Sequence, residues 1–219
     1  MHETLTAPLS NPALLIAWVA LTAVCLAVLL YDLRVRNPEI MGLMRLVWFL
    51  TVFYSGPLGL ALYWTTGRKQ IRRDSIWRRG ARSTAHCYSG CGLGEVVGIM
   101  ITVGMLSLTT WWVAGVTFVL AYAFGYALTV GPLMQDGVPL KTALWDAFAS
   151  ETASITMMEV VAIGSDIWLS KGATMDQVLF WTSMAVSLSL GLLAAYPVNV
   201  LLIRFGVKEG MHSPKEMAE

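Results

Sequence analysis

A histidine, two cysteines and a glutamate follow one another at helical spacing where the chain becomes apolar. Four residues separate Cys87 from Cys91 and Cys91 from Glu95, and His86 directly precedes the first cysteine. Residues four positions apart lie above one another on an α-helix, so two thiols and a carboxyl group form one stripe. Thiolate and imidazole bind Cu(I), and with a carboxylate they also suit Zn(II) or Fe(II). The spacing therefore predicts a site for a transition-metal ion, with Cu(I) as the first choice.

A second polar stripe follows later in the chain, where Glu151, Met158 and Glu159 share one broad face of a helix. If both helices enter the membrane from the same side, Glu95 and Glu151 lie at similar depth and can meet. We expect no Lys or Arg at that depth, so a bound cation would neutralise the carboxylates. Protonation and a hydrogen-bonded carboxyl pair are the alternatives. The predicted metal ligands are His86, Cys87, Cys91, Glu95, Glu151, Met158 and Glu159.

Small and polar residues are predicted to support this site. Gly90, Gly94 and Gly98 recur every four residues, a pattern that lets another helix backbone approach closely. The expected partner is the following apolar segment, which offers Ala121 and Gly125 at the same spacing. The residues assigned to structure or gating are Gly90, Gly94, Gly98, Ser154 and Asp166.

The composition places these residues in a membrane. Hydrophobic residues make up 56% of the 219 residues and charged residues 13%, which is typical of an integral membrane protein. A net charge of +1 gives no indication of nucleic-acid binding, and three cysteines in or beside apolar segments do not indicate a disulfide framework.

Six apolar runs are long enough to cross a bilayer as helices, which predicts an all-α, polytopic helical bundle. Seven of the 15 Lys and Arg lie between residues 68 and 82, so the positive-inside rule makes this loop cytoplasmic. Threading six spans from there places both termini and the 136–141 loop inside, and the loops at Arg36 and Lys171 outside. The predicted spans are 12–31, 43–65, 86–110, 112–134, 143–165 and 177–204.

The polar intramembrane residues are concentrated in the later spans, which suggests a division of the chain. We expect a transmembrane hairpin at 1–66, a basic cytoplasmic loop at 67–82, a functional four-helix domain at 83–206 and a cytoplasmic tail at 207–219.

The polar residues also resemble a known family. The sequence has His86-Cys87, then Gly-Cys-Gly-Leu-Gly-Glu over 90–95, then Glu-Thr-Ala-Ser-Ile-Thr over 151–156, and Glu159. This pattern resembles the bacterial membrane family called domain of unknown function 4396 over roughly residues 80–206. The resemblance implies an acidic residue at position 151, where many members have Asp, but it implies no activity. It places the protein in a bacterial inner membrane.

The leading hypothesis is a non-enzymatic membrane transporter or metal-handling protein that passes Cu(I) along these ligands while the carboxylates exchange protons. No nucleotide-binding motif is present, and the expected partners are membrane lipid, the metal ion and a second copy packed through a glycine-rich face. A membrane thiol oxidoreductase using Cys87 and Cys91 is one alternative, although one helical turn seldom gives good disulfide geometry. A non-catalytic assembly subunit is the other.

Overall fold

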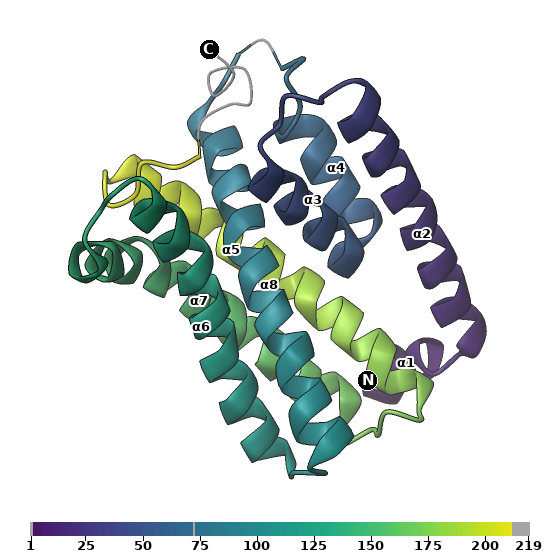
Figure 1. The fold of residues 1–219 in the computed structure, drawn as a ribbon. Coiled ribbons are helices and arrows are strands. Elements are labelled where there is room, and N and C mark those ends of the chain that lie inside the picture. Colours follow the sequence, from purple (N-terminus) through teal and green to yellow (C-terminus); the bar gives the residue numbers. More distant parts are fainter. Residues whose placement is uncertain (1, 72, 212–219) are drawn as a thin grey trace.

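The described residues of the computed structural model, 2–71 and 73–211, form helices joined by short loops, with no strand among them (Figure 1). The helices are α1 (His2–Leu9), α2 (Pro12–Val35), α3 (Gly42–Ser55), α4 (Pro57–Thr66), α5 (Ile76–Ile99), the π-helix η1 (Met100–Met105), α6 (Thr110–Gln135), α7 (Leu140–Ser170) and α8 (Val178–Arg204).

Five of these segments are long and apolar enough to cross a membrane: α2, α5 with η1, α6, α7 and α8. Their outward faces carry large apolar side chains, as lipid contact requires. The predicted all-α membrane bundle is confirmed. The prediction that residues 43–65 form one membrane-spanning helix is wrong, because these residues form two short helices, α3 and α4.

Helices α3 and α4 form an antiparallel hairpin and do not continue in one direction. Gly56 adopts a left-handed conformation with φ 50°, and Pro57 begins α4, so the helix ends where a proline starts the next one. Trp48 in α3 packs edge-on against Tyr63 in α4, with ring centroids 5.3 Å apart. A Cβ at Gly59 would lie only 2.6 Å from the carbonyl oxygen of Thr51. The chain therefore turns back inside the bundle.

The hairpin brings the loop after α2 and the loop after α4 to the same end of the molecule. The buried Asp32 accepts hydrogen bonds from Arg68 at 2.8 and 3.0 Å and from the Tyr63 hydroxyl at 2.8 Å. Lys69 pairs with Glu39 at 2.7 Å. The prediction that the Arg36 loop and the basic loop lie at opposite ends is therefore wrong, because residues 43–65 return to the end at which they began.

Positive charge is concentrated at this end, which we call the basic end. Of the thirteen Lys and Arg among the described residues, twelve lie at this end, and Lys171, which follows α7, lies at the other end. The termini separate accordingly: the Thr182 hydroxyl, near the start of α8, donates to the Leu9 carbonyl, whereas the Met211 amide donates to Ser83 near the start of α5. The described ends of the chain thus lie at opposite ends of the bundle. The prediction that both termini lie on one side is wrong, because the hairpin removes one crossing.

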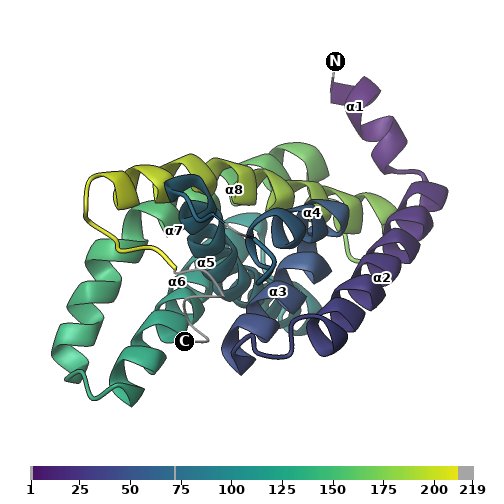
Figure 2. The same ribbon diagram turned by 90° about the horizontal axis from the view of Figure 1, so that it is seen from above.

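Helix α5 is the central element and lies between the α2–α4 group and the pair α6 and α7 (Figures 1 and 2). It begins at Ile76, with the Ser75 hydroxyl accepting from the Arg78 amide, so residues 76–82 of the predicted basic loop form its first turns. The predicted packing against the next span is confirmed. A Cβ at Gly94 would lie 2.5 Å from the Ala121 backbone, and one at Gly90 would lie 2.9 Å from the Gly125 Cα.

Candidate functional site

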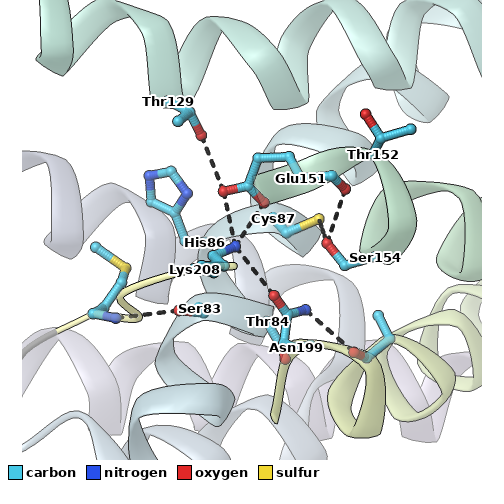
Figure 3. A network of polar contacts seen from close by, with 12 residues as sticks. Ser83, Thr84, His86, Cys87, Thr129, Glu151, Thr152, Ser154, Asn199 and Lys208 are labelled. Atoms are coloured by element: carbon cyan, nitrogen blue, oxygen red, sulfur yellow. Dashed lines mark hydrogen bonds and ion pairs between the residues drawn. The ribbon is translucent and has the colours of Figure 1, made fainter. Parts of the chain in front are cut away.

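A buried ion pair between Glu151 and Lys208 occupies the basic end of the bundle (Figure 3). The Lys208 ammonium donates to both Glu151 carboxylate oxygens at 2.7 and 2.8 Å and to the Asn199 side-chain oxygen at 3.1 Å. The Thr129 hydroxyl donates to Glu151 at 3.4 Å. The expectation that no Lys or Arg neutralises this carboxylate is wrong, because the chain folds back after α8 and inserts Lys208.

The segment that carries Lys208, residues 205–211, is attached to the start of α5; we call it the strap. Arg79 donates to the Glu209 carbonyl, and the buried Arg82 donates to the Met211 carbonyl at 2.8 and 2.9 Å. The first residues of the predicted tail, 207–211, are therefore packed against the bundle, and the rest of that tail lies outside the described residues. It lines one side of a pocket of about 730 Å³ whose other walls include His86, Thr129 and Glu151.

The two thiols of α5 come next along the bundle. The sulfur of Cys87 lies 3.7 Å from the Ser154 hydroxyl, which donates to the Glu151 carbonyl at 3.0 Å. Cys91 interacts with Cys87 and with Glu159, and both cysteines are buried and free. The structure thus brings together two thiols, a hydroxyl and a carboxyl group at the interface of α5 and α7. The helical spacing predicted the shared face of the two thiols, but it predicted Glu95 as their carboxyl neighbour and not Glu159.

Glu159 supplies the carboxyl group of this cluster and is almost completely buried. It is 1% exposed, and its Oε2 atom has no hydrogen-bond partner among the described residues. Met158 is also buried, but its side chain lies against Gly191 of α8. An unpartnered buried carboxyl oxygen is costly, so this position is a candidate for a proton or a cation.

Glu95 lies toward the opposite end, in a second pocket of about 180 Å³ that it lines together with Asp166 and Thr117. The Ser183 hydroxyl donates to Asp166 at 2.8 Å. The prediction that Glu95 meets Glu151 is wrong, since the two carboxylates line different pockets. Because α5 begins at Ile76, Glu95 lies about 28 Å along its helix, whereas Glu151 lies about 16 Å along α7.

Except for Met158, which lies against α8, the predicted ligands therefore form a series along the bundle and do not converge on one centre. His86 and Glu151 lie at the basic-end pocket, Cys87, Cys91 and Glu159 lie between the pockets, and Glu95 with Asp166 lies at the other pocket. Within residues 2–71 and 73–211, no group of three or more His, Cys, Asp or Glu is placed to hold a metal ion. Lys208 is the functional candidate that the sequence analysis missed, because it stands in a polar segment outside every apolar run.

Comparison with known proteins identifies a family but no activity. The family model described as "Domain of unknown function (DUF4396)" matches residues 76–208, so the chain belongs to this family, as its residue pattern predicted. The match extends from the first residue of α5 to Lys208. No curated protein and no solved structure matches the chain.

Proposed function

We propose that this member of the DUF4396 family is a membrane transporter that passes a soft transition-metal ion, with Cu(I) as the first candidate, between helices α5 and α7. The observation that supports the proposal is the series of polar side chains between two pockets at opposite ends of the bundle. Polar and ionisable groups within a membrane are costly and usually belong to ion or proton pathways. A packing role alone would not require carboxyl groups at three successive levels.

The two thiols favour a soft cation as the cargo. Thiolates bind Cu(I), and Cys87 and Cys91 can present two sulfurs to one ion, whereas Zn(II) takes three or four protein ligands. A thiol must lose its proton to bind a metal. Binding through both thiolates releases two protons. The unpartnered Oε2 of Glu159 can accept one of them, and Glu95, the next acidic residue along α5, can accept the other. The two carboxyl groups then carry the protons while the ion occupies the thiolates, so the metal and two protons would exchange places.

The distribution of charge suggests the orientation. Cytoplasmic loops carry an excess of Lys and Arg, and nearly all of those in the described chain lie at the basic end. We therefore propose that the basic end faces the cytoplasm of a bacterial inner membrane, with the strap inside and α1 on the opposite side.

Metal uptake by reconstituted protein tests the proposal. Liposomes containing the purified protein and an internal Cu(I)-sensitive dye should show uptake that is lost in Cys87→Ser/Cys91→Ser and strongly slowed in Glu159→Gln. The matched control is Cys25→Ser, which removes a buried thiol of α2 outside the series. Elemental analysis of the same preparations would reveal any ion that copurifies with the wild-type protein and not with the double variant.

Two results would refute the transport proposal. Wild-type liposomes that take up no Cu(I), Zn(II) or Fe(II), with a reversible Cys87–Cys91 disulfide, would support the oxidoreductase alternative. Uptake unchanged by removal of both thiols would show that the series of side chains is not the path.

A further inference from the structure

The strap closes the basic-end pocket with a cation that belongs to the protein itself. We propose that the strap is a gate, and that Lys208 keeps it closed by placing its ammonium group in a cation site formed by Glu151 and Asn199. The inference rests on the proposed function, because it assigns an entrance to the same path.

The surroundings of the ammonium group have the character of a cation site. Three oxygen atoms, two from Glu151 and one from Asn199, lie within 2.7–3.1 Å of Lys208 Nζ. An ammonium group has three donors, so each donor has a partner. The Lys208 and Glu151 side chains are only 10% and 5% exposed. The Asn199 amide nitrogen donates to the Ala195 carbonyl at 3.2 Å, which orients the side-chain oxygen toward Lys208.

The strap also has the features of a movable segment. It is not helical, and its glycines Gly206 and Gly210 both adopt left-handed conformations, with φ 72° and 77°. These glycines flank Lys208, and glycine tolerates large backbone rotations. Beyond Lys208, the strap is attached mainly through backbone groups of Glu209 and Met211. Release of the ion pair would therefore free the Lys208 side chain and the backbone between the two glycines, while the hydrogen bonds of Glu209 and Met211 keep the strap attached to α5.

Exchange of one cation for another makes this gate responsive to cargo. A buried carboxylate without a partner costs several kcal/mol, so Lys208 does not leave Glu151 without a replacement. A cation that reaches Glu151 supplies that replacement, and the Lys208 ammonium then returns to water at the basic end. The gate opens when cargo is present and closes when it departs.

The native thiol of Cys87 reports the state of the gate without any measurement of transport. It lies beyond the Glu151–Lys208 pair and is 2% exposed. In a Cys25→Ser background, alkylation of Cys87 by a small water-soluble reagent, followed by mass spectrometry, should be at least about tenfold faster in Lys208→Met, because a buried thiol reacts only in an open state. Lys141→Met is the matched control, since it removes an exposed lysine at the same end.

Destabilisation is separated from gating by a second variant. Lys208→Met/Glu151→Gln leaves no unpaired buried charge, and it should also react about tenfold faster than wild type while melting near the wild-type temperature. Wild-type alkylation rates in this double variant would overturn the gate, whether or not the protein transports Cu(I). Faster alkylation in a protein that takes up no metal would support the gate and refute the proposed cargo.

Discussion

Substitution of Gly94 by alanine should separate the two helices that enclose the thiols. A Cβ at this position would lie 2.5 Å from the Cα and N atoms of Ala121 and from the carbonyl carbon of Leu120. Non-bonded carbon atoms prefer about 3.5–4.0 Å, so α5 and α6 would have to move apart by about 1 Å. All three obstructing atoms belong to helix backbone, which cannot rotate away as a side chain can.

The expected cost is set by two opposing effects. Overpacking a well-filled interior costs about 1–3 kcal/mol, and the value here should be at the upper end because backbone must move. Alanine recovers about 1 kcal/mol of helix propensity relative to glycine. Gly94→Ala should therefore lower the free energy of unfolding by about 2 kcal/mol. Gly115→Ala in α6 is the matched control: no atom lies within 4 Å of its added Cβ, so it should be neutral or slightly stabilising.

Thermal unfolding of the purified protein in detergent measures the difference between the two variants. Alkylation of Cys91 provides a second measurement, since a Cβ at Gly125 of α6 would lie 3.4 Å from the Cys91 sulfur. Separation of α5 and α6 should uncover this thiol in Gly94→Ala and leave it covered in Gly115→Ala. Equal melting temperatures for the two variants, with Cys91 equally protected, would refute the close packing of these helices.

Three further predictions concern the two buried ion pairs and the topology of the chain. Asp32→Ala should lower the free energy of unfolding in detergent by about 3–5 kcal/mol, because it leaves the Arg68 guanidinium without its buried partner. Glu39→Gln, at an exposed pair, should change the melting temperature little, and equal effects of the two substitutions would contradict the role of Asp32 in the hairpin. In the same measurement, Lys208→Ala should lower the free energy of unfolding by about 3–5 kcal/mol, whereas Lys208→Met/Glu151→Gln should lower it much less. Equal losses of stability would mean that the ion pair is not buried. An impermeant maleimide should label Ser10→Cys and Asp136→Cys from opposite sides of a membrane vesicle, and labelling from one side would restore the six-span topology.

Local periodicity accounts for the parts of the site that the sequence predicted. Cys87 and Cys91 share a face, and Gly90 and Gly94 meet Gly125 and Ala121, because helical spacing alone decides which residues are neighbours on a helix. Depth was not predictable in the same way. Hydropathy began the third span at residue 86, but the arginine-rich turns from Ile76 are also helical, and this difference is what separates Glu95 from Glu151.

The hairpin shows a different limit. Residues 43–65 have the length and apolarity of a transmembrane helix, and Gly56-Pro57 indicates only that the helix is interrupted. Whether the chain then continues or reverses depends on contacts with distant residues. Asp32, which holds Arg68 and Tyr63 after the turn, fixes the reversal, and no pattern within residues 43–65 contains that information.

The buried ion pairs divide the carboxyl groups of the bundle into two classes. At the basic end, Asp32 and Glu151 are each neutralised by a cation from a loop, Arg68 and Lys208. Toward the other end, Glu95, Glu159 and Asp166 form no ion pair within the described chain. A cation that enters from that end meets free carboxyl groups first, whereas one that enters from the basic end must displace Lys208. The Glu151–Lys208 pair therefore controls access of the cation to the path from the basic end. The net direction of transport is set by the ion and proton gradients, since a gate that returns to its starting state supplies no energy. Removal of Lys208 should therefore speed movement in both directions equally.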